Sequence, residues 1–322
     1  MYSDKRVLLI AGGGTLGTHT ANELLRLGAC VEVICPEEKI SKNERLIFHR
    51  GYATEELLKA LFSKKHYDGI VNFIHYPEPE DYKRIHPLLI ENTDHLIFLS
   101  SYRVYGNAQH PITEDAPRLT ETVCDPDFLA NEKYAVPKAR CEDYLRNERR
   151  GDPFTIVRPV ISFSRYRLDL FMYSGETILK AAKEGRELLL PSLAKDFTAG
   201  LDWAGNSGKL IANLLFKPAA IGNTYTIYSG HNKTWGEIAK IYQSITGARI
   251  RFCDEEEYLA ANPDHTEDGP RRWQWIYDRR FNRDIDSTRV LAVTGLSQKD
   301  FMPIDYGIRY EIEEYKKGLS SL

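Results

Sequence analysis

Long apolar runs and clustered cysteines are both missing from the 322-residue sequence. No run approaches the roughly 20 residues that a membrane-spanning helix needs, and the N-terminus lacks the layout of a signal peptide. The five cysteines are scattered and form no C-x-x-C pair, which argues against a disulfide framework or a structural zinc site. We therefore expect a protein of the reducing cytoplasm with no membrane partner.

An excess of charge of one sign is missing as well. The net charge is −3 and the isoelectric point is about 6.3. Such a balance gives no general attraction to nucleic acid, so nucleic acid is not an expected partner. The nine histidines include no H-E-x-x-H or other ligand spacing, so no metal site is expected. The partner that we expect, a small-molecule substrate, is indicated by the motifs described below.

Short apolar runs alternate with amphipathic stretches through the first half of the chain. The predicted strands are residues 6–11, 31–35, 46–48, 69–74, 96–100 and 154–157. Helices are predicted between them, among others at 55–62 and 81–91. Alternation of this kind implies parallel strands joined by right-handed crossovers, and therefore an α/β fold with a doubly wound parallel sheet.

A glycine-rich turn follows the first predicted strand and opens the first predicted helix. It satisfies G-x-G-x-x-G, in which glycines let backbone N–H groups approach a pyrophosphate and the helix N-terminus adds partial positive charge. In this strand–turn–helix context the pattern predicts a dinucleotide-binding turn. Its expected contact residues are Gly12, Gly14, Thr15, Leu16 and Gly17.

The carboxylate that usually closes the second strand and binds the adenosine ribose is absent or displaced. Cys35 stands at that position, and Glu37 is the next acid. Lys39 and Lys42 lie beyond it and are able to meet a 2′-phosphate, although solvated surface lysines are the plainer interpretation. NAD and NADP therefore both stay open as the cofactor.

Tyr134 and Lys138 form a Y-x-x-x-K pair and lie on one face of a predicted helix. An ammonium beside a phenol lowers the phenol's pKa, which suits acid/base work near neutral pH. Ser101 follows the fifth strand, at the carboxyl edge where ligands bind in open α/β sheets. We expect Ser101, Tyr134 and Lys138 to form the catalytic set, with Pro137 in the first helical turn or at a kink.

These motifs occur in a known order. The glycine turn, Ser-Ser-x-x-Val-Tyr-Gly at 100–106, Tyr-x-x-x-Lys and Arg158-Pro159 resemble the extended short-chain dehydrogenase/reductase family, in its NAD-dependent epimerase/dehydratase group. The resemblance covers nearly the whole chain and implies a Rossmann fold. It also implies that Tyr134 is the acid/base, that Lys138 holds the nicotinamide ribose, and that Ser101 binds the reacting oxygen.

Four further positions are assigned to the cofactor. Cys35 and Tyr52 stand where the family usually has residues that face the ribose and the adenine. His75 follows the fourth strand, with a core or rim histidine as the alternative. Arg158 closes the sixth strand, with a structural ion pair as the alternative. We include all four among the expected cofactor-binding residues.

The second half of the chain is less regular. Residues 224–228 predict a further strand of the same sheet, and helices are predicted at 235–246 and 304–317, with a loop at 262–268. We expect a dinucleotide-binding domain over residues 1–165, to which 199–230 returns, and a smaller interleaved substrate lobe over 166–322. Arginines of this lobe are candidates for gripping a diphosphate: Arg165, Arg167, Arg279, Arg280 and Arg283. Trp273 and Trp275 are expected to pack the lobe, with stacking on a nucleobase as the alternative.

The leading hypothesis is an NAD(P)-dependent enzyme of the epimerase/dehydratase type, acting on a nucleotide-linked sugar or a similar hydroxylated substrate. One alternative is an NADPH-dependent reductase of a small carbonyl substrate. Another is a non-catalytic dinucleotide-binding or RNA-associated scaffold. The family resemblance also suggests a homodimer that packs through the helices near 81–91 and 133–149.

Overall fold

A seven-stranded parallel sheet forms the centre of the computed structural model, which describes residues 2–165 and 167–320. The strand order is β12-β6-β5-β4-β1-β2-β3, and every adjacent pair is parallel. The strands are β1 (Arg6–Ile10), β2 (Cys30–Cys35), β3 (Leu46–Arg50), β4 (Gly69–Asn72), β5 (Leu96–Leu99), β6 (Phe154–Pro159) and β12 (Thr224–Ile227). The order reverses at β1, where open sheets of this kind bind their ligands. The predicted doubly wound fold is confirmed.

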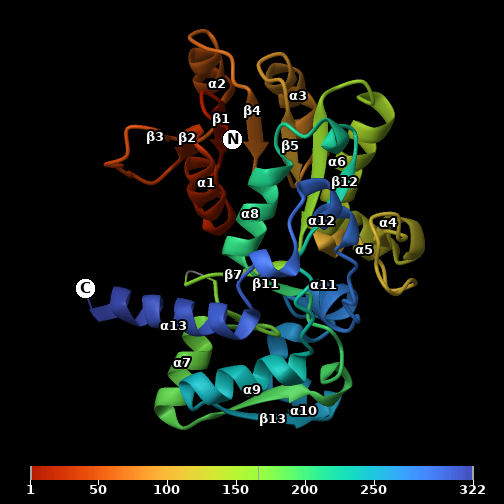
Figure 1. The fold of residues 1–322 in the computed structure, drawn as a ribbon. Coiled ribbons are helices and arrows are strands. Elements are labelled where there is room, and N and C mark those ends of the chain that lie inside the picture. The colour runs from red at the N-terminus through yellow and green to blue at the C-terminus, as the bar shows by residue number, and fades with distance from the viewer. Residues whose placement is uncertain (1, 166, 321–322) are drawn as a thin grey trace.

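Helices cover both faces of the sheet (Figure 1). On one face lie α1 (Thr15–Leu27), α8 (Ala204–Leu214) and α12 (Thr288–Thr294). On the other lie α2 (Glu55–Phe62), α3 (Pro79–Ile90) and α6 (Ala135–Glu148). Leu9 of β1 packs into the first of these two cores and Leu8 into the second. A strand that is buried on both faces needs apolar residues throughout, which explains the continuous apolar run at the start of the chain.

A separate hydrophobic core holds the lower part of the molecule in Figure 1. Its main elements are α7 (Gly175–Glu184), β10 (Glu187–Pro191), α9 (Trp235–Thr246), β13 (Arg249–Cys253), α10 (Glu255–Ala261) and α13 (Ile304–Ser320). The buried Trp235 and Trp275 both belong to this core. The sheet and this lobe are linked by β7 (Ile161–Phe163) and β11 (Leu201–Trp203), which pair in parallel. The domain limits at 165 and 166 stay a prediction.

The remaining elements are short. They are η1 (Tyr102–Val104), α4 (Leu119–Thr122), α5 (Pro126–Asn131), β8 (Asp169–Leu170), β9 (Tyr173–Ser174), η2 (Ser192–Ala194), η3 (Pro218–Ala220), η4 (Pro263–His265), α11 (Arg272–Gln274), the π-helical η5 (Trp275–Arg279) and η6 (Gln298–Asp300). The predicted loop at 262–268 therefore contains a 3₁₀ turn. Within the described residues, no helix is long and apolar enough to cross a membrane, and no group of three or more potential ligands is arranged to hold a metal ion.

Candidate active site

The glycine turn brings the start of α1 against the end of β1. A Cβ added to Gly17 would lie 2.3 Å from the Gly12 carbonyl oxygen, so the helix can approach the turn only because residue 17 is glycine. Ala11 adopts φ 55°, a left-handed conformation that usually falls to glycine. A Cβ on Gly14, by contrast, would meet nothing within 4 Å. This open side of the turn leaves room for a phosphate group.

The N-terminus of α1 itself is free to receive an anion. Gly14 is the N-cap residue, so no side chain caps the first turn, and that turn carries no acidic residue. Backbone N–H groups at an uncapped helix start are donors for phosphate, and the helix dipole favours negative charge there. The Thr15 hydroxyl lies 3.0 Å from the Ser164 hydroxyl, which joins the turn to the segment after β7. The turn therefore fits the pyrophosphate of a dinucleotide.

Cys35 lies beneath this turn. Its side chain is buried, and a Cβ added to Gly13 would come within 2.6 Å of the Cys35 Cβ and 2.9 Å of a Glu37 carboxylate oxygen. Glu37, two residues after Cys35, thus places a carboxylate beside the turn, where one was expected at position 35. The Lys39 ammonium donates to the Gly13 carbonyl at 2.6 Å. Tyr52 is 77% exposed and follows β3.

Tyr134 is the N-cap residue of α6, and Lys138 stands one turn into that helix. The Lys138 Nζ donates to the Leu99 carbonyl at 2.7 Å and lies 5.3 Å from the centroid of the Tyr134 ring. Ser101, 4% exposed, precedes the 3₁₀ turn η1 and accepts a hydrogen bond from the Arg103 N–H at 3.2 Å. Because β5 ends beside the start of α6, the serine, the phenol and the ammonium meet at the carboxyl edge of the sheet.

Local sequence explains how α6 begins at this place. One carboxylate oxygen of Glu132 accepts the N–H groups of Tyr134 and Val136, both at 2.9 Å, and so satisfies donors that the helix start leaves open. Pro137 lies in the first turn, where its missing N–H costs nothing, as its position predicted. The glutamate cap fixes the backbone of the tyrosine.

A second cation, Arg103, lies over the phenol. Its guanidinium carbon is 4.9 Å from the Tyr134 ring centroid. Burial alone would raise the pKa of the Tyr134 phenol, but the charges of Lys138 and Arg103 and a hydrogen bond with Ser101 outweigh burial and lower the pKa from its usual 10.0. Sequence reasoning missed Arg103. The available signal was its place two residues after Ser101, at the same strand end.

A buried carboxylate holds Arg103 in place. Asp278, 1% exposed, accepts hydrogen bonds from the Tyr102 hydroxyl at 2.9 Å and from Arg283 at 3.0 Å, and it is paired with Arg279. The Arg103 Nε lies 3.6 Å from the same carboxylate. Burial opposes ionisation of Asp278, yet the surrounding arginines lower its pKa. Three arginines thus surround Asp278, and Arg103 also lies 3.4 Å from the buried Glu132 carboxylate.

One cavity of about 240 Å³ joins these parts. Thr15 and Leu16 of the glycine turn, Ser101 and Tyr134 all border it, together with the arginines at 103, 167 and 279. The start of α1, Ser101, Tyr134 and arginines of the lobe therefore face the same space. Among the other lobe arginines, Arg280 pairs with Glu255 and Arg165 lies 3.4 Å from Glu314.

Two expected cofactor residues have clear partners. His75 lies beside the phenol, with ring centroids 5.1 Å apart, and its Nε2 lies 2.7 Å from the Lys133 carbonyl oxygen. For Arg158 the structure shows the ion pair that was the alternative interpretation. It is fully buried, binds Glu142 with two hydrogen bonds of 2.8 and 2.5 Å, and does not line the cavity that Tyr134 borders, so nothing in the structure supports its assignment to the cofactor.

The two tryptophans serve packing in the structure. Trp275 is 2% exposed and packs edge-on against Phe171. Trp273 packs against Phe128, with ring centroids 5.5 Å apart. Neither borders the catalytic cavity within the described part of the chain.

Comparison with known proteins defines the class. The model of the NAD dependent epimerase/dehydratase family matches residues 8–203, which is more than half of the chain. The protein therefore belongs to this family, and a nicotinamide dinucleotide is the family's cofactor. No curated protein matches the chain significantly.

Solved structures agree with this fold over nearly the whole chain. A UDP-glucose 4-epimerase from Thermotoga maritima, solved with UDP-glucose, is 16% identical, with TM-score 0.68 and coverage of 98% of this chain and 99% of the other. The UDP-glucuronic acid 4-epimerase from Bacillus cereus, in complex with UDP-glucuronic acid and NAD, is 15% identical, with TM-score 0.68 and coverage of 97% and 99%. UDP-glucose-4-epimerase from Stenotrophomonas maltophila, with NAD and formylated UDP-arabinopyranose, is 14% identical, with TM-score 0.69 and coverage of 98% and 99%.

Proposed function

We propose that the protein is an NAD-dependent enzyme that acts on a hydroxyl group of a nucleotide-linked sugar. The observation that carries the proposal is the Tyr134 phenol, set between Lys138 and Arg103, which faces the same cavity as the uncapped start of α1. A phenol with a lowered pKa beside a dinucleotide-binding turn suits proton transfer coupled to hydride transfer.

Each residue has a defined task in this reaction. Tyr134 removes the proton from the reacting hydroxyl as its phenolate, which the two neighbouring cations stabilise. The Ser101 hydroxyl binds the same substrate oxygen and orients it towards the phenol. Lys138 is fixed by the Leu99 carbonyl and has further N–H donors for the nicotinamide ribose. The bound nicotinamide supplies the hydride acceptor for the carbon that carries the hydroxyl.

Arginines favour a substrate with a diphosphate. Arg167 and Arg279 border the catalytic cavity on the side of the lobe. Guanidinium groups bind phosphate oxygens in pairs, so these two are suited to the nucleotide part of the substrate. The three solved relatives named above were bound to, or are named for, UDP-sugars. UDP-sugars are therefore the first substrates to test.

The cofactor is NAD rather than NADP in this proposal. The Glu37 carboxylate lies against the glycine turn and would repel a 2′-phosphate, whereas Lys39 is already bonded to the Gly13 carbonyl. We expect wild type to bind NAD more tightly than NADP. Glu37→Gln should reduce that ratio by roughly tenfold, since it removes one like-charge contact. An unchanged ratio in Glu37→Gln would contradict the assignment.

The main experiment incubates the purified protein with NAD and either UDP-glucose or UDP-glucuronic acid. Products are followed by NMR, which separates epimers, dehydrated sugars and oxidised sugars. Calorimetry in parallel measures NAD and NADP binding. Turnover of a UDP-sugar that depends on NAD is the expected result. Absence of binding by both cofactors at millimolar concentration would overturn the proposal.

The homodimer is also proposed, through α3 and α6. These helices pack against each other on one face of the sheet, and a groove between them is bordered by Lys83, Arg140 and Tyr144. Light scattering at the column outlet gives the mass in solution. A monomer at micromolar concentration would exclude this arrangement.

A further inference from the structure

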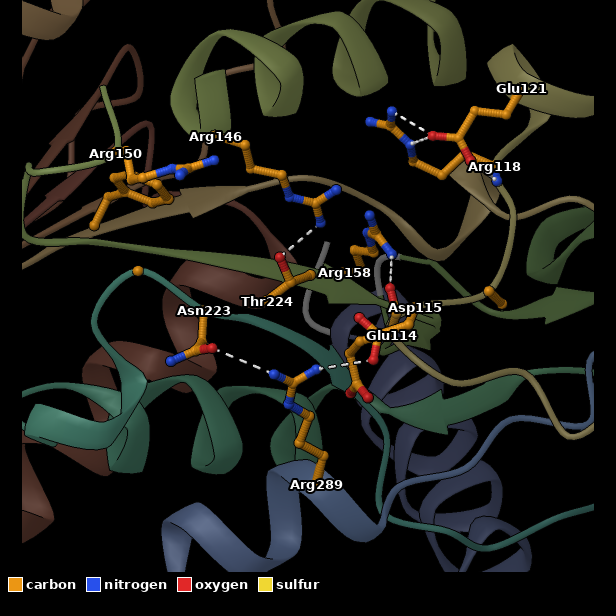
Figure 2. A pocket seen from close by; sticks show the side chains of 13 residues that line it. Glu114, Asp115, Arg118, Glu121, Arg146, Arg150, Arg158, Asn223, Thr224 and Arg289 are labelled. Carbon is orange, nitrogen blue, oxygen red and sulfur yellow. Dashed lines mark hydrogen bonds and ion pairs between the residues drawn. The ribbon is translucent and has the colours of Figure 1, made fainter. Parts of the chain in front are cut away.

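A second cavity, of about 450 Å³, lies at the outer edge of the sheet. The edge strand β12 and the start of β6 line it, α6 borders it from one face of the sheet and α12 from the other (Figure 2). Within residues 2–165 and 167–320, no residue lines both this cavity and the one that Tyr134 borders. We call it the edge cavity and describe it by Glu114, Asp115, Arg146, Arg150, Thr224 and Arg289.

Three arginines face the edge cavity and are held mainly by neutral groups. Arg146 donates to the Thr224 hydroxyl at 2.8 Å, and Arg289 donates to the Asn223 amide oxygen at 3.2 Å, as Figure 2 shows. Arg150 makes no hydrogen bond or ion pair with any residue in the described part of the chain. Each guanidinium therefore keeps donors for a ligand.

The carboxylates that lie behind these arginines already have closer partners. Arg158 takes both oxygens of the buried Glu142, whereas Arg146 lies 3.6 Å from that carboxylate. Arg118 pairs with Asp143 at 2.7 Å. Burial lowers the pKa of Arg146 below its usual value, which agrees with a cation that is short of compensating charge. Glu121, which also lines the cavity, pairs with Arg118 at 2.6 Å. The carboxylates on this side are therefore taken up by Arg118 and Arg158, which leaves Arg146 and Arg150 without a close carboxylate partner within the described residues.

The opposite wall carries acceptors. Glu114 accepts the Thr226 N–H through one carboxylate oxygen at 2.8 Å, and Asp115 lies 3.7 Å from Arg289 with a side chain that is 90% exposed. Carboxylate oxygens suit sugar hydroxyls, which donate hydrogen bonds. The aromatic residues nearby, Phe154 and Tyr225, are buried, at 1% and 3% exposure, and offer no face on which a nucleobase stacks.

We propose that the edge cavity binds a phosphorylated sugar, with its phosphate on Arg146, Arg150 and Arg289 and its hydroxyls on Glu114 and Asp115. Guanidinium groups from two elements are suited to a phosphate dianion. A cavity of this size accommodates a small metabolite. The site is independent of the catalytic cavity, so it does not rest on the proposed reaction.

The test measures binding of glucose 1-phosphate to the full-length protein by calorimetry, with NAD present in excess to occupy the glycine turn. Glucose and inorganic phosphate are titrated separately. The expected order of affinity is glucose 1-phosphate, then inorganic phosphate, with no binding of glucose. The double variant Arg150→Gln/Arg289→Gln should weaken binding of glucose 1-phosphate by about tenfold or more, because two charge-assisted contacts are lost.

Arg149→Gln is the matched control. It removes the same charge one residue from Arg150, but Arg149 pairs with Asp152 at 2.8 Å and does not line the cavity. It should bind glucose 1-phosphate as wild type does. Because Arg150 and Arg289 are exposed, the double variant is expected to fold, and its thermal unfolding midpoint verifies this.

Three outcomes overturn the proposal. Glucose 1-phosphate fails to bind at millimolar concentration, or it binds the double variant as tightly as wild type, which would indicate an adventitious ion only. Equal affinity for inorganic phosphate and glucose 1-phosphate would show that Glu114 and Asp115 do not bind the sugar hydroxyls, which contradicts the proposal. Failure of NAD to bind in the same titrations would count against the proposed function and not against the edge cavity.

Discussion

Two buried carboxylates of this protein each lie among three arginines, but the two groups border different cavities. Glu142 of α6 has Arg158, Arg118 and Arg146 around it. Asp278 has Arg279, Arg283 and Arg103. In each group one arginine also pairs with a second carboxylate: Arg118 with Asp143 and Arg103 with Glu132.

The difference between the groups lies in what the outermost arginine meets. Arg103 of the Asp278 group lies over the Tyr134 ring, so the excess charge acts on an ionisable phenol. Arg146 of the Glu142 group donates to the Thr224 hydroxyl at 2.8 Å and lies 3.6 Å from Glu142, so it faces no group that exchanges a proton near neutral pH. Under our two proposals, the same arrangement serves acid/base chemistry at one place and stability with ligand binding at the other. Charge alone does not define a catalytic centre, because a group that exchanges a proton must also be within reach.

The largest expected effect comes from removing that group. Tyr134→Phe keeps the ring but deletes the hydroxyl, so turnover of the UDP-sugar substrate should fall by about a thousandfold, within the range for loss of an acid/base residue. NAD binding should be retained, since the glycine turn is untouched. Steady-state kinetics and calorimetry measure the two quantities. Activity that survives the substitution would exclude Tyr134 from the reaction.

The next effect tests the Glu142 group as a structural unit. Glu142→Ala leaves the fully buried Arg158 unpaired, which should lower the free energy of unfolding by about 3–5 kcal/mol. Urea titration measures this loss. Glu121→Ala removes an acid that is 48% exposed from Arg118 and should cost less than about 1 kcal/mol.

The stability difference between wild type and Glu142→Ala should also depend on pH in a defined direction. Burial opposes ionisation of Glu142, but Arg158 outweighs it and lowers the pKa from 4.5 to about 2. A lowered carboxylate pKa stabilises the folded state fully above pH 4.5, and this stabilisation is lost as the pH falls towards 2. The difference between wild type and Glu142→Ala should therefore shrink over that window. A difference that grows on acidification would contradict the ion pair.

The sequence predicted the Rossmann half of the molecule closely, because local rules decide it. Continuous apolar runs mark strands buried on both faces, and the helix at 55–62 begins and ends where predicted, as does the helix at 235–246 in the lobe. The helix predicted at 81–91 begins earlier, at Pro79, which occupies the first helical position. The strand-end position of Ser101, the helical spacing of Tyr134 and Lys138, and the order of the family motifs together predicted that these three residues lie near one strand edge.

Contacts between distant segments were beyond such rules. Asp278 and Tyr102 are 176 residues apart, and no local pattern connects them. In strand β13, the charged Arg249 and Arg251 alternate with apolar residues. Its partner strand is β10, in which Glu187 pairs with Arg249 across 62 residues of sequence. From the sequence, Arg158 is a residue at the carboxyl end of a strand, where ligands bind. Only the structure shows that it is paired with the buried Glu142. The edge cavity had no sequence signal because five separate segments form it.

A smaller effect is expected from Arg103, the arginine of the Asp278 group that lies over Tyr134. Arg103→Gln removes one of the two cations over Tyr134, so the pKa of the phenol should rise and the acidic limb of the activity profile should move to higher pH. Activity should fall by about tenfold near pH 6, for a shift of about one unit, and recover at alkaline pH. The pH profile of kcat is the measurement, and Arg103→Lys should restore part of it. A uniform loss at every pH would assign Arg103 to folding or to substrate binding.

The smallest effect concerns Glu114, which borders the edge cavity near the Glu142 group and has the opposite pH behaviour. Burial raises the pKa of the Glu114 carboxyl, and the Thr226 N–H that it accepts lowers it only in part. A raised carboxylate pKa means that the folded state holds the proton longer than the unfolded state, so stability falls as the pH rises above the ordinary value of 4.5. Glu114→Gln removes this fall and keeps an acceptor for Thr226, so it should change stability by at most about 1 kcal/mol and make the profile flatter above that pH. Urea midpoints across the range measure it, and a steeper profile in Glu114→Gln than in wild type would show that ionised Glu114 stabilises the fold.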